Sequence, residues 1–285
     1  MAAAYWHLLI GKKAIESLEQ KRLDSGHFAC INNYPLVFLG GIQGPDINYF
    51  PGGDKAVSSL AHYGRPADLG RNLLSLAETH EERAYALGWL MHLTTDVITH
   101  PLVNRMILQR FSRECKNGMD PDAYPLGHHR VEWGIDVYML RNRNIAAGLP
   151  DLDEVLNAVR HLHAFVSKAF LSSYDHRLHE KTWQGAIDGM IKYVGIFRRA
   201  WRLTGRLDED PPGTQLLKNL FYRTVALPFF NIAALRSPQN GVGAFIPVLP
   251  GAKDVEEVLS YTEKVRQTFL DYLADDFRRL VNRTA

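Results

Sequence analysis

Residues 81–100 carry three ionisable side chains at strict four-residue spacing within a largely apolar stretch. The segment, EERAYALGWLMHLTTDVITH, has no proline and a single glycine, so it predicts a helix. Residues four apart lie on the same helical face, and His92, Asp96 and His100 therefore form one stripe two turns long. Buried ionisable groups are costly unless they are paired or bound to a metal. Imidazole and carboxylate suit zinc and similar cations, so the stripe predicts a metal site, with a polar helix face exposed to solvent as the alternative.

A second pair repeats the spacing further along the chain. His128 and Glu132 are four residues apart in a segment whose periodicity also predicts a helix. Such pairs also occur as ordinary ion pairs on helix surfaces, so this motif alone is weak. His129 is adjacent and is an alternative ligand, although the spacing favours His128.

Three upstream residues are further ligand candidates. Asp46 ends the segment GGIQGPD, which we interpret as part of a Gly-rich loop spanning residues 32–53 that lets a carboxylate approach a bound ion. The alternative for Asp46 is an ordinary turn aspartate. His62 could equally be a loop histidine, and His7 could be a core or helix-end histidine.

Helical periodicity runs through most of the remaining sequence and predicts an all-α fold, one compact bundle with the metals between its helices. The expected helices are residues 7–23, 67–77, 81–100, 102–112, 127–142, 152–171, 179–207, 214–227 and 254–282. The best strand candidate is residues 241–248, which Pro247 weakens. We expect a single domain over residues 1–285, with the metal-site portion in 1–145 and a helical C-terminal portion in 146–285.

Composition narrows the class of protein. The net charge of +2 gives no sign of a stable nucleic-acid partner. The two cysteines have no CxxC spacing, so neither a thiolate metal site nor a disulfide framework is expected. Lys12 and Lys13 follow the short apolar stretch at the start rather than preceding it, which is the reverse of a secretory signal. We therefore expect a cytoplasmic protein.

Several of these motifs, in this order, resemble the zinc-dependent phospholipase C family, which is similar in fold to the single-strand-specific zinc nucleases. The similarity covers about half of the chain. It rests on HLLIGKKAIESL from His7, GPD at 44–46, AHYG at 61–64, ALGWLMHLTTD at 86–96 and HHRVE at 128–132. The ALG-x3-H-x3-D segment is the most specific of these pieces.

The resemblance implies a ligand set for each metal. Asp46, His62, His92 and Asp96 would hold one zinc, and His100, His128 and Glu132 would hold a second. His7 would help to hold a third, with Asp96 as a bridging carboxylate. The family completes that third site with an N-terminal tryptophan, whereas Trp6 is internal here, so two ions are the firmer expectation. His100 also follows Asp96 more closely than the equivalent pair in the family's secreted enzymes.

The expected function is zinc-dependent hydrolysis of a phosphodiester, with Asp46 both as a ligand and as the group that accepts a proton from the attacking water. Iron or manganese would also suit a site without thiolates. The expected substrate is a small phosphoester or a phospholipid, with transient contact with a membrane surface; the sequence leaves the oligomeric state open. The alternatives are a nuclease or nucleotidase on the same scaffold, and a catalytically inactive protein whose metal is structural.

Overall fold

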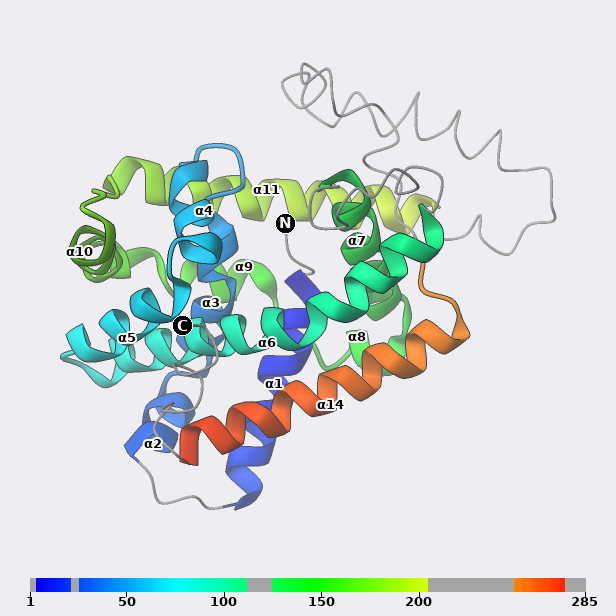
Figure 1. The fold of residues 1–285 in the computed structure, drawn as a ribbon, viewed down its shortest axis with the longest axis horizontal. Coiled ribbons are helices and arrows are strands. Elements are labelled where there is room, and N and C mark those ends of the chain that lie inside the picture. The colour runs from blue at the N-terminus through cyan, green and yellow to red at the C-terminus, as the bar shows by residue number, and fades with distance from the viewer. Residues whose placement is uncertain (1–3, 22–25, 112–124, 205–248, 275–285) are drawn as a thin grey trace.

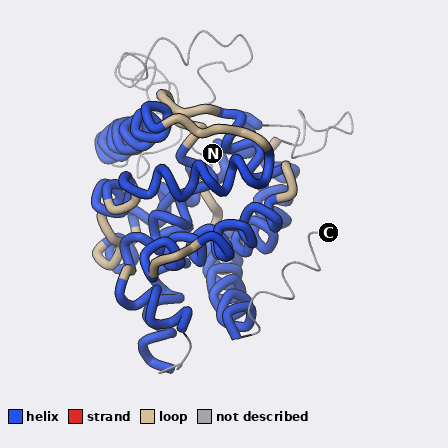
Figure 2. The backbone as a smooth tube through the Cα atoms, turned by 90° about the vertical axis from the view of Figure 1, so that its left-hand side faces the viewer, coloured by secondary structure: helices blue, strands red, loops and turns tan. Residues whose placement is uncertain are grey.

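The structure is a computed structural model that describes residues 4–21, 26–111, 125–204 and 249–274. Every regular element among these residues is a helix, which confirms the predicted all-α fold (Figures 1 and 2). The helices are α1 Ala4–Lys21, α2 Gly26–Asn33, α3 Pro35–Ile47, α4 Lys55–Tyr63, α5 Pro66–Leu76, α6 His80–Arg110, α7 Pro125–Arg141, α8 Arg143–Ala146, α9 Leu152–Asn157, α10 His163–Tyr174, α11 Glu180–Thr204 and α14 Ala252–Ala274, with a 3-10 turn at Arg160–Leu162.

Helix α6 runs through the middle of the molecule and contacts α2, α3, α5, α7 and α14 (Figure 1). It begins with a capping box in which Thr79 Oγ1 accepts from Glu82 N and the Glu82 carboxylate accepts from Thr79 N. The prediction of two helices interrupted at Pro101 was wrong, because α6 continues through that proline. Burial of Leu102, Met106 and the apolar residues between and after them outweighs the single backbone hydrogen bond that proline removes.

Helix α3 contradicts the prediction of a Gly-rich loop over residues 32–53. Most of that segment is helical, and α3 is buried from Val37 to Ile47. Its glycines permit a close crossing with α6: a Cβ on Gly41 would lie 2.2 Å from Tyr85 O, and one on Gly88 would lie 2.0 Å from Phe38 O. Glycine and proline predict loops from local preference, but here burial in the core stabilises the helix.

The predicted helix over residues 152–171 is divided into α9 and α10 by the 3-10 turn. The break has a packing reason, because the Arg160 carbonyl leaves the helical pattern and accepts from Trp183 Nε1 and Gln184 Nε2 on α11. Sequence periodicity carries no information about such a tertiary contact.

Helix α14 packs along α1 and α6 on one side of the molecule (Figure 1). Trp6 Nε1 donates to Thr262 Oγ1 at 2.8 Å, and Arg266 Nη1 donates to Ser17 Oγ at 2.7 Å, so both ends of α1 are tied to α14. The predicted helix 214–227 and strand 241–248 lie outside the described residues. Within the described ranges, no helix combines the length and the apolar character needed to cross a lipid bilayer.

Candidate metal centre

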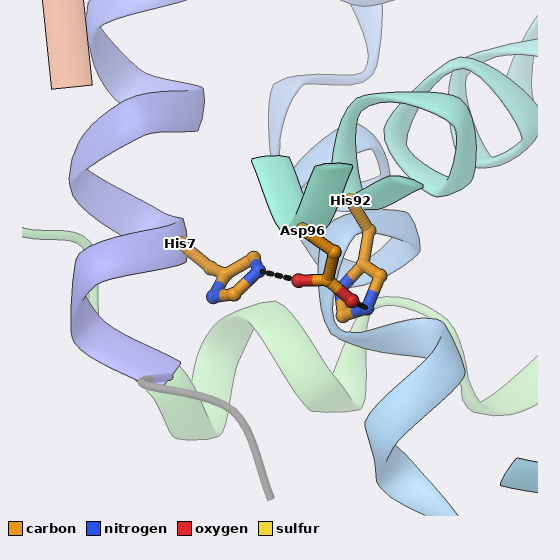
Figure 3. A group of neighbouring side chains, drawn as sticks. All are labelled: His7, His92 and Asp96. Carbon is orange, nitrogen blue, oxygen red and sulfur yellow. Dashed lines mark hydrogen bonds and ion pairs between the residues drawn. The ribbon is translucent and has the colours of Figure 1, made fainter. Parts of the chain in front are cut away.

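The stripe on α6 forms the centre of the site. His92 Nε2 lies 3.0 Å from Asp96 Oδ2, and His100 Nε2 lies 3.8 Å from Asp96 Oδ1 (Figure 3 shows the first pair). His92 is fully buried, whereas His100 keeps 33% of its side chain exposed. The helical spacing read from the sequence therefore brings these three side chains together as expected.

Asp46 and His62 reach this stripe from two other helices. Asp46 is in the last turn of α3 and is not a loop residue, and His62 is in the last turn of α4, also within a helix. His62 Nε2 lies 3.3 Å from Asp46 Oδ1, 3.2 Å from His92 Nε2 and 3.6 Å from Asp96 Oδ2. The crossing of α3 over α6 thus brings Asp46 beside the stripe, although the two lie far apart in the sequence.

Four of the six distances among the donor atoms of Asp46, His62, His92 and Asp96 are close to those of a tetrahedral zinc site. They run from 3.0 to 3.6 Å. A tetrahedron with zinc–ligand bonds of about 2.0–2.2 Å has edges of about 3.3–3.6 Å. Asp46, His62 and His92 form one group of donors, and Asp96 joins His92 and His7 in a neighbouring group.

The rings of two histidines are held by backbone carbonyls. His92 Nδ1 lies 2.8 Å from Ile42 O on α3, and His62 Nδ1 lies 2.7 Å from Ser58 O on α4. A hydrogen on Nδ1 in each ring leaves the Nε2 lone pair directed at the other ligands, which is how metal-binding histidines are usually oriented. These carbonyl partners have no signal in the sequence, because every residue supplies the same backbone group.

A second cluster lies on the other side of Asp96. It comprises His100, His128 and Glu132, whose donor atoms all lie within 4.8 Å of one another. His128 Nε2 is 3.0 Å from Glu132 Oε1, and the His100 and His128 rings meet edge to face. The geometry places His128 rather than His129 in this cluster. Three protein ligands, with His100 partly exposed, leave room for water or substrate at a fourth position.

His7 completes a third group with His92 and Asp96. Its Nε2 lies 3.3 Å from Asp96 Oδ1, while its ring stacks on that of His92 with centroids 4.7 Å apart (Figure 3). Asp96 therefore faces His7 and His100 with Oδ1, and His62 and His92 with Oδ2. This is the arrangement expected of a bridging carboxylate.

The electrostatics favour ionised carboxylates at the centre. Burial alone would raise the pKa of Asp46 and of Asp96, but His92 and the other surrounding histidines outweigh it and hold both pKa values below the usual range. Burial likewise opposes the effect of His128 on Glu132, whose pKa is nevertheless lowered. The pKa of His62 is raised, because Asp46 and Asp96 outweigh its burial.

Two buried oxygens support a bound cation. Among the described residues, Asp46 Oδ2 and Glu132 Oε2 are shielded from solvent and have no hydrogen-bond partner. A buried carboxylate oxygen without a donor is costly, and a divalent cation in each cluster would compensate that cost. The donor set of imidazole and carboxylate therefore fits zinc in both clusters.

Asp136, Thr95 and Thr99 are candidates by sequence position for partners that orient the metal ligands, although an ordinary capping or surface role is the favoured interpretation of all three. Thr95 Oγ1 donates to Met91 O, an ordinary bond within the helix. Asp136 Oδ1 accepts from the backbone N–H groups of Tyr5 at 2.9 Å and Trp6 at 3.0 Å, so it caps the start of α1. The contacts at the Nδ1 atoms of His92 and His62 come from the carbonyls of Ile42 and Ser58.

Comparison with known proteins agrees with this geometry. A family model described as zinc dependent phospholipase C matches residues 6–189, which is well over half of the chain and spans every candidate ligand. Neither curated proteins nor solved structures gave a match. On the matched span and the zinc-compatible clusters within it, the chain belongs to the zinc-dependent phospholipase C family.

Proposed function

We propose that the protein hydrolyses phosphodiesters of the phospholipase C type, with zinc held by Asp46, His62, His92 and Asp96 and by His100, His128 and Glu132. A third ion would involve His7 and the bridging carboxylate of Asp96. The observation that carries this proposal is the cluster of His100, His128 and Glu132, which offers only three protein ligands and includes the partly exposed His100. A purely structural metal would be expected to have a closed shell throughout.

Zinc in such a site neutralises the phosphoryl oxygens and lowers the pKa of bound water from about 15.7 towards 7. The residues of the chain supply binding, orientation and proton transfer. Asp46 has one oxygen, Oδ1, facing His62 and a second, Oδ2, without a hydrogen-bond partner among the described residues. Because its pKa is low, Asp46 is ionised at neutral pH, and its carboxylate oxygen that is not bound to zinc would accept the proton of the attacking water.

Aromatic side chains beside His62 support a lipid substrate. The Tyr49 and Tyr63 rings lie 5.4 and 5.9 Å from the ring of His62. Tyr63 is 81% exposed. An exposed aromatic ring beside the ligands would give a phospholipid a surface to rest on while its phosphate reaches the metals. The single-domain organisation and the cytoplasmic location remain predictions.

The test is a substrate comparison with the zinc-loaded full chain. We expect release of the phosphorylated headgroup from phosphatidylcholine vesicles, and turnover of bis(p-nitrophenyl) phosphate, both abolished by a chelator and restored by zinc. Single-stranded DNA cleaved in preference to both would assign the protein to the nuclease alternative. A zinc-loaded chain without activity on any of the three substrates would favour the structural-metal alternative.

Asp46→Asn separates the two roles of Asp46. The amide keeps a ligating oxygen but accepts a proton poorly, so we expect zinc to be retained and turnover to fall by about 10²–10⁴-fold. A variant that keeps both its zinc and full turnover would remove the proton-accepting role and leave the ligand role intact.

A further inference from the structure

The first turn of α1, which carries His7, is held by side chains from three other helices. Asp136 on α7 accepts from the backbone N–H groups of Tyr5 and Trp6, and Gln43 Nε2 on α3 donates to Ala4 O at 3.2 Å. A helix leaves its first N–H groups without internal partners, and a side-chain oxygen directed at them supplies the missing acceptor. Asp136 therefore serves as a cap supplied from another helix.

The third contact comes from beyond the span that matches the family. Trp6 is buried, and its Nε1–H donates to Thr262 Oγ1 on α14 at 2.8 Å. The Thr262 hydroxyl donates in turn to Val258 O at 2.7 Å, so its acceptor side is directed at Trp6. The family match ends at residue 189, whereas α14 begins at Ala252.

Trp6 and His7 are adjacent in the first turn of α1, so hydrogen bonds that hold Trp6 in place also restrain the position of His7. His7 must hold its ring against His92 and its Nε2 at 3.3 Å from Asp96 Oδ1 (Figure 3). Rotation or fraying of this turn would move that nitrogen away from the carboxylate, and the hydrogen bonds to the backbone of the turn and to the Trp6 indole oppose such a movement.

We propose that Thr262 and Asp136 are positioning residues for metal binding at His7, fixing the first turn of α1 through the Trp6 indole and through its backbone N–H groups. This inference rests on the proposed function only in taking His7 as a zinc ligand. It assigns a purpose to α14, which contributes none of the candidate ligands itself.

The experiment measures zinc binding to the full chain by competition with a chromophoric chelator, together with the absorption spectrum of the cobalt(II) form. His7→Ala identifies which binding step depends on His7. We expect Thr262→Val to weaken that same step by about 10–100-fold and to leave the other steps unchanged, since loss of a partner that orients a ligand typically has this effect. Thr262→Ser keeps the hydroxyl and should restore binding, and Asp136→Asn, which keeps an acceptor oxygen, should bind more tightly at this step than Asp136→Ala.

Ser17→Ala is the matched control, because it removes the other hydrogen bond between α1 and α14 at the end of α1 far from His7. It should leave every zinc step unchanged. Should Thr262→Val fail to fold, Trp6→Phe removes the same hydrogen bond without burying an unpaired donor, and the same weakening is expected.

The inference is overturned if Thr262→Val and Trp6→Phe bind zinc like the wild type, if Ser17→Ala weakens the same step equally, or if His7→Ala changes no step. Each of these results leaves the proposed function standing, because the wild type still binds zinc. A wild-type chain that binds no zinc at all overturns the proposed function and this inference together.

Discussion

Replacing Gly88 by alanine tests whether the close crossing of α3 and α6 sets the geometry of the metal centre. A Cβ at this position would lie 2.0 Å from Phe38 O and 2.9 Å from Ile42 N, both backbone atoms that cannot rotate away. Raising the first distance to an ordinary 3.4 Å requires the two helices to separate by about 1.4 Å. His92 is one turn beyond Gly88, and its Nδ1 lies 2.8 Å from Ile42 O, so the same separation would break that hydrogen bond.

The magnitude follows from three opposing effects. Overpacking costs about 1–3 kcal/mol, and a buried imidazole that loses its partner costs about 1–3 kcal/mol more. Alanine recovers about 1 kcal/mol through its higher helix propensity. We expect the zinc-free protein to lose about 1–5 kcal/mol in its free energy of unfolding, which lowers Tm by about 2–8 °C for a chain of this size. Zinc affinity should fall by about 10–100-fold, because the ring of His92 is no longer oriented.

The assay pairs thermal unfolding of the zinc-free protein with a zinc competition titration. Gly195→Ala on α11 is the matched control, since a Cβ at that helical glycine has no atom within 4 Å. It should raise the free energy of unfolding by up to about 1 kcal/mol and leave zinc affinity unchanged. A Gly88→Ala variant that is as stable as Gly195→Ala and binds zinc as tightly as the wild type would refute the argument from the helix crossing.

Three further predictions concern the start of α6, the pH response and the metal. Thr79→Ala removes the hydroxyl half of the capping box and should lower the free energy of unfolding by about 1 kcal/mol, with zinc affinity unchanged; a loss of zinc binding would contradict it. In the zinc-free protein, the raised pKa of His62 contributes stability below about pH 6.5 that is lost as pH rises through its folded value. The lowered pKa of Asp46 contributes stability above about pH 4 that is lost on acidification, so melting temperatures measured without zinc should be highest between these limits and not above pH 8. Chelation should abolish hydrolysis and lower Tm while preserving the far-UV circular dichroism of a helical protein, because the apolar core extends over α5, α9, α10, α11 and α14, which carry none of the candidate ligands; loss of that signal would indicate a structural metal.

Much of the site could be predicted because helical spacing converts directly into shared faces. The four-residue steps from His92 to His100 and from His128 to Glu132 placed their side chains as the structure has them. Asp46, His62 and His7 were each weak in isolation. The resemblance to a family groups these three residues as metal ligands, and in the structure they lie beside the stripe.

What could not be predicted depends on tertiary packing. The glycines of α3 were interpreted as signs of a loop, but Gly41 allows the backbone of α6 to approach, and burial then favours the helix. The carbonyls of Ile42 and Ser58 that orient two histidines are invisible in a sequence. Asp136 is one turn beyond Glu132, where an ordinary capping or surface role is the favoured interpretation; the structure shows that its oxygen caps α1, a helix far away in the sequence. Burial raises the pKa of Asp136 to about 8 despite those two hydrogen bonds.

Zinc content per chain tests the central claim most directly. Mass spectrometry would be applied to the full chain purified without a chelator or a polyhistidine tag, beside the double variant His92→Ala/Asp96→Ala. We expect two or three zinc ions per wild-type chain and fewer in the double variant, since Asp96 contacts four of the candidate ligands, His7, His62, His92 and His100. A wild-type chain that carries no metal after growth with added zinc would contradict the account, and so would a double variant that retains the full complement.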